Sequence, residues 1–389
     1  MKNRRRVVLV SPDYPPPLSA GSAVYFYNLV ENATEPMDIL TAPLPAGMQD
    51  VSSRRHGVIH SRFLVRGNDA TSIRLFLMYL YLFFWTLKIG VWRRYELVVF
   101  FTSVIGNGFF SVLFRLLRVR IISFILAEEI PMARKAPGLK GMLKRLCIKG
   151  YSWANAFISN CDFATAILIR MGIDSNRICM IPSPVAHKKI CSDFTKRHLR
   201  RNGCYEILTV ARLAKHKGVH LIIDALDILR KDIPDIHLTV VGDGTEKCSL
   251  MDQVSSKGLE RHVTFTGAIF DDEKISLLYN SCDLFVLANI MLKNGNCDGT
   301  PNVLIEASAH GKPVIAGIEG GTSSAVVDGV TGYLLDPRDI SLLSKVMKNL
   351  LLDRELAARL GTNGRRKVEE EHNPVKAGLR FSTFLRQVA

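Results

Sequence analysis

Short apolar runs alternate with longer amphipathic segments along the first half of the chain. The apolar runs predict strands at Val7–Val10, Leu97–Phe101, Ile121–Leu126 and Phe157–Ser159. The spacing of apolar positions between them predicts helices at Ser22–Asn32, Leu75–Trp92, Phe109–Arg118, Leu139–Ala154 and Asp162–Met171. Because such alternation builds a parallel sheet covered on both faces, this half predicts a doubly wound α/β domain.

The second half of the chain repeats this plan. The predicted strands are Tyr205–Val210, His237–Val241, Val263–Thr266, Leu284–Leu287, Val314–Ala316 and Gly332–Leu334. The predicted helices are Gly218–Lys231, Glu246–Lys257, Asp271–Asn280, Pro301–His310 and Asp339–Leu352. The pattern therefore predicts two Rossmann-like domains in series, with the carboxyl ends of both sheets facing a shared central cleft, where open α/β sheets bind ligands.

The boundary between the two domains is predicted from a break in the pattern. Pro182 and Pro184 cannot continue a helix or a central strand, and a polar, basic segment, 188–202, follows them. We expect an N-terminal domain over 1–188, a linker over 189–203 and a C-terminal domain over 204–372. Residues 373–389 are expected to form a helix that packs back toward the first domain.

The composition narrows the class of protein. Of the 389 residues 48% are apolar and 22% charged, which are values of a globular chain and exclude disordered, collagen-like and disulfide-scaffold classes. The eight cysteines contain no Cys-x-x-Cys pair and no zinc-type spacing with histidine. The first apolar run, Val7–Val10, is too short for a signal peptide. Reduced thiols in the cytoplasm are therefore expected.

The positive charge is concentrated in the first half. The chain has a formal charge of +15, and residues 1–190 contain 25 Lys and Arg against 11 Asp and Glu, while the remainder contains 26 against 25. The sequence has no helix-turn-helix, zinc-finger or aromatic-interleaved RNA motif, so nucleic acid is not an expected partner. An anionic membrane surface is the partner that the basic first domain favours, with the protein peripheral on the inner face.

One segment bears directly on membrane binding. Leu75–Leu87 is a run of 13 uncharged residues between Arg74 and Lys88, whereas a spanning helix needs about 20 apolar residues. Two interpretations remain open: a buried helix, or a helix that docks in the plane of the membrane. The aromatic residues and basic flanks favour the second.

Candidate binding residues lie on loops at the predicted carboxyl edges of the sheets. Arg212 and Lys217 follow the first strand of the second domain, where a guanidinium and an ammonium could hold one diphosphate. Gly242, Gly244 and Gly267 end the next two strands and would let the backbone approach a nucleotide.

A second group of candidates surrounds a predicted helix N-terminus. Pro301 suits the first turn of a helix, whose free N–H groups accept anions. Asp298 precedes this helix and Glu306 lies inside it, so that one carboxylate could bind sugar hydroxyls and the other ribose hydroxyls. The alternative is a capping aspartate and a surface glutamate. The segment 317–322 follows another strand and is consistent with a plain loop.

In the first domain, Gly21 and Ser22 lie between the first strand and the first helix. Their backbone N–H groups could reach a phosphate from across the cleft.

The order and spacing of these motifs resemble the retaining nucleotide-sugar glycosyltransferases of family 4, which have the two-domain GT-B fold. The resemblance covers nearly the whole chain and is weakest between 32 and 94, where acceptor recognition would be built. It implies that Arg212 and Lys217 neutralise the diphosphate of the donor. The Glu-x7-Glu motif of the family falls on Asp298, which would read the donor sugar, and Glu306, which would bind the ribose.

The resemblance also implies that Asn302, Val303 and Leu304 give backbone contacts to the phosphates and ribose, and that Gly21 closes on the donor. Three positions depart from the family pattern. Asp298 replaces the first glutamate, Gly21-Ser22 replaces a Gly-Gly pair, and Ala127-Glu128-Glu129 stands where many members have a histidine. Glu128 or Glu129 is therefore the candidate on the acceptor side.

The expected reaction is transfer of a sugar from a nucleoside diphosphate sugar to an acceptor hydroxyl, on a lipid-linked sugar or a surface polysaccharide. The chain contains no Asp-x-Asp triplet, so neither a metal nor another cofactor is expected. Two alternatives remain: a GT-B epimerase or phosphorylase, and a catalytically weak binding subunit of the same fold.

Overall fold

The computed structural model describes residues 7–12, 14, 21–43, 56–64, 72–92, 95–100, 104–125, 129–185 and 203–389. The chain divides into two compact units. Unit 1 comprises Met1–Pro184 and Pro374–Ala389, and unit 2 comprises Val185–Asn373. The division falls four residues before the predicted end of the first domain, 188. Of the predicted linker only Gly203 is described, because 186–202 lie outside the described residues.

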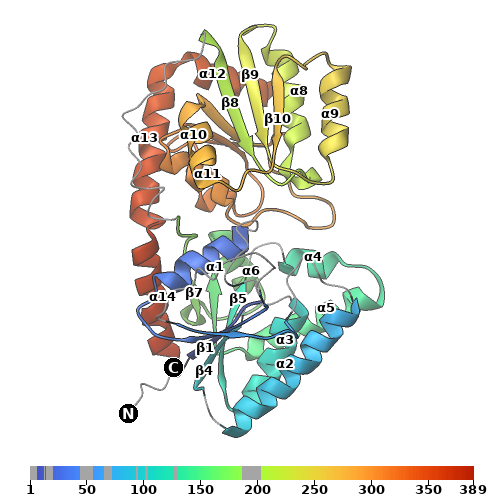
Figure 1. Ribbon diagram of the computed structural model, residues 1–389, viewed down its shortest axis with the longest axis vertical. Coiled ribbons are helices and arrows are strands. Elements are labelled where there is room, and N and C mark those ends of the chain that lie inside the picture. Colours follow the sequence, from blue (N-terminus) through green and yellow to red (C-terminus); the bar gives the residue numbers. More distant parts are fainter. Residues whose placement is uncertain are drawn as a thin grey trace. The chain divides into compact units, whose positions relative to one another are not determined.

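Unit 1 is built on a parallel sheet with the order β3-β2-β1-β4-β5-β6-β7 (Figure 1). Its strands are β1 (Val7–Val10), β2 (Asp38–Thr41), β3 (Gly57–His60), β4 (Leu97–Phe100), β5 (Arg120–Ile125), β6 (Ala156–Ser159) and β7 (Ile178–Met180). Its helices are α1 (Gly21–Glu31), α2 (Ser72–Trp92), α3 (Val104–Leu116), α4 (Glu129–Lys135), α5 (Gly138–Gly150), α6 (Asp162–Arg170) and α14 (Pro374–Val388). The short elements β2, β3, β7 and α4 were not predicted from the sequence.

Alternate residues of the unit 1 strands enter two separate cores. Val8 and Val10 pack with α2 to α6 on one face of the sheet, whereas Val7 and Leu9 pack with α1 and α14 on the other. This is the burial expected of a parallel sheet with helices on both faces. The C-terminal helix α14 lies beside α1 (Figure 1) and contributes the buried Phe381 to the second core.

Helix α2 packs against the core of unit 1 through one line of residues. Met78, Leu82 and Thr86 are buried at helical spacing, while Leu77 and Phe84 are exposed. The segment is therefore not the fully buried helix of the first interpretation, and contact with a membrane stays a prediction. In the part of the chain that the structure describes, no helix has the length and apolarity to cross a bilayer.

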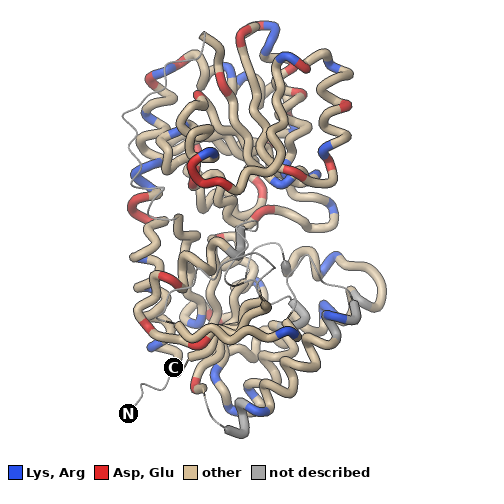
Figure 2. Tube along the Cα trace, viewed as in Figure 1, with Lys and Arg blue, Asp and Glu red and all other residues tan. Residues whose placement is uncertain are grey.

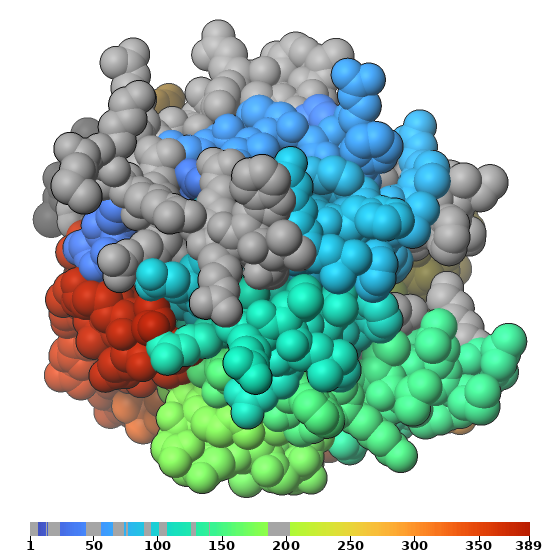
Figure 3. All heavy atoms as spheres, turned by 90° about the horizontal axis from the view of Figure 1, so that it is seen from below, coloured from blue at the N-terminus to red at the C-terminus, as the bar shows by residue number. Residues whose placement is uncertain are grey.

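Positive charge on unit 1 lies partly on three helices that contain no acidic residue. The sequences of α2, α3 and α5 include seven Lys and Arg and no Asp or Glu (Figure 2). The segment around α5, green in the space-filling view of Figure 3, is at the surface of the molecule.

Unit 2 is built on a second parallel sheet, of the order β10-β9-β8-β11-β12-β13. Its strands are β8 (Tyr205–Val210), β9 (Ile236–Val241), β10 (Val263–Gly267), β11 (Leu284–Leu287), β12 (Val314–Gly317) and β13 (Tyr333–Leu335). Its helices are α8 (Val219–Leu229), α9 (Lys247–Ser256), α10 (Asp272–Ser281), α11 (Asn302–Ala309), α12 (Ile340–Leu352) and α13 (Arg354–Glu371). Helix α13 was not predicted.

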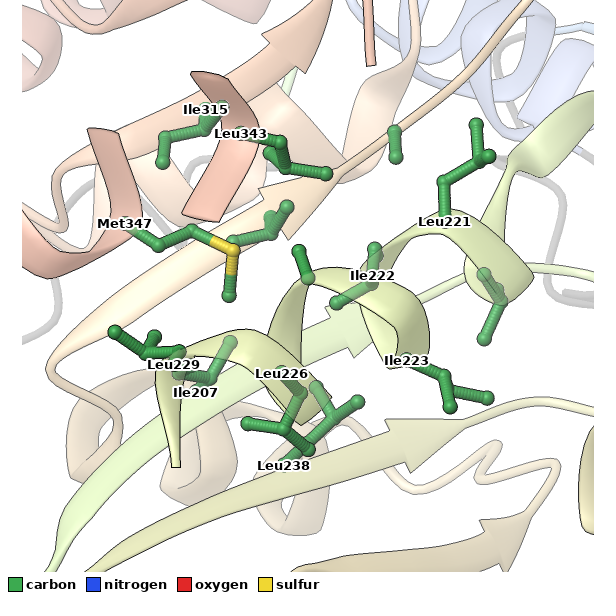
Figure 4. Packing of buried hydrophobic residues seen from close by; sticks show 14 of the residues in the cluster. Ile207, Leu221, Ile222, Ile223, Leu226, Leu229, Leu238, Ile315, Leu343 and Met347 are labelled. Carbon is green, nitrogen blue, oxygen red and sulfur yellow. The ribbon is translucent and has the colours of Figure 1, made fainter. Parts of the chain in front are cut away.

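The two faces of this sheet are also covered. Helices α8, α9 and α12 pack over one face, where Ile222 and Leu226 of α8 meet Ile207 and Leu238 of the strands (Figure 4). Helices α10, α11 and α13 cover the other face. The backbone N–H of Val185 donates to the carbonyl of His372 at 3.0 Å, so the two ends of unit 2 are tied together.

Candidate functional site

The strand order of unit 2 reverses between β8 and β11. Successive strands β8, β9 and β10 run outward in one direction, and β11, β12 and β13 in the other. A reversal of this kind leaves a crevice outside the carboxyl ends of the two central strands, where α/β sheets bind ligands. The loop after β8 carries Arg212 and Lys217, and the loop after β11 carries Asp298.

Backbone packing brings these two loops together. The chain turns through a short 3-10 helix, Lys215–Lys217, and ends it at Gly218, which has φ +66°. A Cβ at Gly218 would lie 1.7 Å from the carbonyl oxygen of Ala288, so only glycine fits. The carbonyl of His216 also accepts a hydrogen bond from the N–H of Ile290 at 2.8 Å. The loop after β8 is thereby fixed against the loop after β11.

Lys217 and Asp298 form an ion pair across the crevice. The Lys217 Nζ lies 2.5 Å from Asp298 Oδ1, and the two side chains are 16% and 11% exposed. The second oxygen, Oδ2, is buried and has no hydrogen-bond partner within the described residues. A buried carboxylate oxygen without a donor is costly, so Asp298 has an acceptor that a ligand hydroxyl would satisfy.

The loop after β12 holds the backbone of Asp298. The N–H of Gly321 donates to the Asp298 carbonyl at 3.0 Å, and a Cβ at Gly320 would lie 2.3 Å from the same oxygen. The Asn289 amide joins this loop to β11, because it accepts from Gly317 N at 3.2 Å and donates to Thr322 Oγ1 at 2.9 Å. The segment 317–322 therefore positions a site residue, a role that the sequence did not reveal.

His216 is a site residue that the sequence analysis missed. Its side chain is buried, with Nε2 3.9 Å from Asp298 Oδ1 and Nδ1 3.5 Å from Asn296 Nδ2. Burial lowers the pKa of His216 below 6.5, the charges of Lys217 and Arg212 act in the same direction, and Asp298 opposes them. The imidazole is thus neutral at neutral pH. Its place between Arg212 and Lys217 in the sequence was the available signal.

Arg212 contributes a free cation to the same loop. Its side chain is exposed, and no carboxylate pairs with it in the described part of the chain. It is close enough to His216 to influence the pKa of that imidazole. Arg212 is thus available to an anion, whereas Lys217 is already paired.

Two of the three predicted glycines are required by packing between loops, and the third, Gly267, is favoured by its φ of +75°. Gly242 has φ +142°, and its Cβ would lie 1.8 Å from the carbonyl oxygen of Ala211; a Cβ at Gly244 would lie 2.4 Å from that of Leu213. The N–H of Gly242 donates to the carbonyl of Gly267 at 2.9 Å. These contacts account for the glycines without a ligand, and nucleotide binding by them stays a prediction.

Helix α11 holds the second predicted carboxylate. Pro301 is the N-cap rather than a residue of the first turn, and Asn302 and Val303 open the helix. The N–H of Leu304 already donates to the Pro301 carbonyl, at 3.1 Å. Glu306 Oε2 accepts a hydrogen bond from the buried Tyr279 hydroxyl at 3.1 Å. Burial raises the pKa of Tyr279, and the nearby Glu306 carboxylate raises it further. The structure thus joins Lys217 to Asp298 and fixes Glu306 through Tyr279.

The predicted residues of unit 1 are described only in part. Gly21 and Ser22 are the first two residues of α1, at the helix N-terminus where N–H groups are free of intrahelical partners. Glu129 is the first residue of α4, and Glu128 lies outside the described residues. Their contact with a donor or an acceptor stays a prediction.

Among the described residues no three His, Cys, Asp or Glu side chains gather in a group that could hold a metal ion. The seven described cysteines are free thiols.

Most of unit 2 is similar to known proteins. Residues 192–367 match the model of the glycosyl transferases group 1. A GDP-mannose-dependent alpha-(1-6)-phosphatidylinositol monomannoside mannosyltransferase of Mycolicibacterium smegmatis is 34% identical over 198 residues, which are 50% of this chain and 49% of that protein. A glycogen synthase of Mycobacterium tuberculosis is 33% identical over 171 residues, 44% of this chain and 40% of that one. The chain spans about half the length of the curated relatives it matches.

Solved structures resemble the whole chain. A sucrose-phosphate synthase from Thermosynechococcus elongatus has a TM-score of 0.79 at 21% identity and covers 99% of both chains. HepE of Anabaena, in complex with UDP-glucose, has a TM-score of 0.75 at 18% identity and covers 98% of this chain and 99% of its own. The fold is therefore GT-B, as predicted. How the two units face one another, and so the shared cleft, stays a prediction.

Proposed function

We propose that this protein is a retaining glycosyltransferase that moves a sugar from a nucleoside diphosphate sugar to an acceptor hydroxyl. The observation that carries the proposal is the Lys217–Asp298 pair at the strand reversal of unit 2, with the unpaired Arg212 on the same loop. The group 1 match covers all three residues. Together they offer two cations for a diphosphate and one carboxylate for a sugar.

The reaction breaks the bond between the anomeric carbon and the diphosphate oxygen. Negative charge develops on that oxygen, and Arg212, Lys217 and the N-terminus of α11 would stabilise it electrostatically. The acceptor oxygen bonds to the anomeric carbon on the face that the leaving group vacates, and its proton passes to the departing diphosphate. We propose no metal for this step, since the chain's own cations offset the charge.

The carboxylates would position the donor. Asp298 Oδ2 would accept a hydrogen bond from a sugar hydroxyl, which would supply the missing partner of this buried oxygen. Glu306 would bind the ribose, with Tyr279 fixing its carboxylate through the hydrogen bond to Oε2. The backbone at Gly21, Ser22, Asn302 and Val303 would supply N–H groups to the phosphates.

Two similar proteins guide the choice of donor and acceptor. The mycobacterial relative is named for GDP-mannose and a phosphatidylinositol mannoside, and HepE was solved with UDP-glucose. We propose a lipid-linked or polysaccharide acceptor at the cytoplasmic face of a membrane, which the basic first half of the chain would approach.

A ligand screen and three variants test the proposal. A UDP, GDP or ADP sugar that binds the folded state should raise the melting temperature of the protein. Arg212→Ala and Lys217→Ala should each lower turnover by about 100-fold or more. Lys215→Ala, which removes an exposed lysine from the same loop, is the matched control and should remain active.

Product analysis separates transfer from epimerisation and phosphorolysis. Transfer gives a free nucleoside diphosphate and a glycosylated acceptor, epimerisation inverts a centre of the sugar, and phosphorolysis gives a sugar 1-phosphate. Normal transfer by both Arg212→Ala and Lys217→Ala would rule the proposed site out, and failure of every nucleotide to bind would favour a subunit without catalysis.

A further inference from the structure

Helix α5 of unit 1 exposes a continuous apolar face. Leu139, Met142, Leu143 and Leu146 are 78%, 59%, 47% and 63% exposed. Residues at this spacing, three and four apart, lie on one side of a helix. We call these four residues the outer face of α5.

The opposite side of α5 is already packed. Gly141 and Ile148, about half a turn around the helix from the outer face, are buried. Where α5 ends, a Cβ at Gly108 of α3 would lie 1.9 Å from the Cys147 carbonyl oxygen, and one at Gly150 would lie 2.3 Å from the Gly108 carbonyl oxygen. The backbones of α3 and α5 therefore touch, and Ile148 is buried beside this contact. The inner side fixes α5, so the outer face is not needed to hold the helix in place.

The positive charge of α5 indicates which kind of surface the outer face would bind. The 13 residues of α5 include four Lys and Arg and no Asp or Glu. An apolar face bordered by cations matches the boundary between acyl chains and anionic headgroups. A second copy of the chain is a poor match, because a symmetric contact would bring the same cations face to face.

Helix α2 is a weaker match to the same surface. Its exposed Leu77, Leu80 and Phe84 also lie on one side, but its 21 residues contain only two Lys and Arg. The density of positive charge is therefore higher on α5, although the apolar run of α2 is the more conspicuous in the sequence.

We propose that the outer face of α5 docks unit 1 onto an anionic membrane, with the helix lying in the plane of the surface. The four apolar side chains enter the headgroup and acyl boundary, while the exposed Arg145 and Lys149, which border this face, meet lipid phosphates. Thirteen residues are too few to span a bilayer, for which about 20 are needed. The inference deepens the proposed function, because it rests on an acceptor held at a membrane, but docking can be measured without any sugar transfer.

Vesicle sedimentation of the full chain tests the proposal. Phosphatidylcholine vesicles containing phosphatidylglycerol should bind the wild-type protein, less so as salt rises, and pure phosphatidylcholine vesicles should bind it weakly. The double variant Leu143→Glu with Leu146→Glu should partition at least about tenfold less. Leu379→Glu on α14 replaces a leucine that is 53% exposed and should bind as the wild type does.

A charge variant gives an independent measurement. Arg145→Gln with Lys149→Gln should weaken binding by about fivefold per cation and flatten its dependence on salt. Circular dichroism and the thermal shift with nucleotide sugars show whether each variant remains folded. Intact vesicle binding with no sugar transfer would reject the proposed function and leave docking standing.

Three results would overturn the assignment to α5. The first is equal binding of wild type and both double variants. The second is loss of binding in Phe84→Glu alone, which would place the contact on α2. The third is a wild-type protein that does not bind anionic vesicles and instead forms a dimer, which the Leu143→Glu with Leu146→Glu variant dissociates.

Discussion

Asp298 is the residue on which the candidate site depends most. It pairs with Lys217 through one oxygen, has His216 3.9 Å away, and keeps its second oxygen without a donor in the described residues. The pair is nearly neutral as it stands, so the net positive charge of the loop comes from Arg212 and Lys215. A diphosphate would therefore compete with Asp298 for the Lys217 ammonium.

Because of this competition, we expect Asp298→Asn to affect nucleoside diphosphate binding and turnover differently. Turnover should fall by about 100-fold, because the acceptor for the sugar hydroxyl is weakened and Lys217 loses its anchor. The affinity for a nucleoside diphosphate should stay the same or rise by up to about fivefold, because Lys217 is freed. Calorimetry and initial rates measure the two quantities.

Glu273→Gln is the matched control for Asp298→Asn. It removes one carboxylate charge from an exposed position on α10 and should change neither quantity. Loss of nucleotide affinity in Asp298→Asn, in parallel with turnover, would contradict the assigned role.

The imidazoles of His216, which is buried, and His220, which is half-buried, predict how stability depends on pH. Burial lowers the pKa of both His216 and His220 below 6.5. The unfolded chain then binds more protons than the folded chain below that pH, so the free energy of unfolding falls as the pH drops. Melting temperatures from about pH 7 to about pH 5 should decline less steeply in His216→Gln with His220→Gln than in the wild type. Equal slopes would refute the prediction.

The residues of the site were predictable one at a time, but their pairing was not. Lys217 and Asp298 each follow a strand and have the type of side chain that the chemistry needs. Their contact depends on which strands are neighbours, because 81 residues separate them along the chain. His216 was missed for the same reason, since its burial comes from the loop after β11.

At the scale of elements, close backbone contacts set the geometry of the loops. Gly218→Ala should destabilise unit 2 by more than about 2 kcal/mol, since it adds a clash to the strain of a positive φ. The clash is with the Ala288 carbonyl oxygen, 1.7 Å from the new Cβ. Because Gly218 follows Lys217 directly, nucleotide affinity should fall as well. Denaturant unfolding and calorimetry check both effects.

Gly258→Ala is the control for this change. Gly258 has φ +60°, but its Cβ would meet nothing within 4 Å, so only about 1 kcal/mol of backbone strain is expected. An equal loss of stability in the two variants would mean that the contact with Ala288 does not matter.

The pattern of apolar residues predicted long elements better than short ones. Every strand of unit 2 was placed to within one residue, because each is an apolar run between turn residues. The edge strand β3 (Gly57–His60) is only partly buried and depends on pairing with β2, which a local pattern does not contain. Helix α13 was missed because Gly361 and Gly364 weaken its helical pattern. The structure requires glycine at position 361, since a Cβ at Gly361 would lie 2.1 Å from the Gly311 carbonyl oxygen.

At the scale of the whole molecule, each unit has its own cores, and the end of the chain returns to the first unit. Helix α14 completes the core that α1 covers. A Cβ at Gly378 would lie 2.1 Å from the Asn32 carbonyl oxygen, and the N–H of Thr34 donates to Ser382 Oγ at 2.8 Å. The sequence predicted a helix there but contained no signal for these partners, which are more than 300 residues away in the chain.

This arrangement predicts that a change near the C-terminus destabilises the N-terminal unit. Phe381 is fully buried, 6.1 Å from the ring of Phe124 on β5, and Phe381→Ala should cost about 3–5 kcal/mol. Hydrogen exchange should then accelerate in α1, β1 and β5, while β8 to β12 keep their protection, because their cores do not include α14. Leu379→Ala, at an exposed position of the same helix, should leave both units protected. Faster exchange in unit 2 alone would mean that Phe381 stabilises unit 2 instead of unit 1. Unchanged exchange in both units would mean that neither unit depends on Phe381.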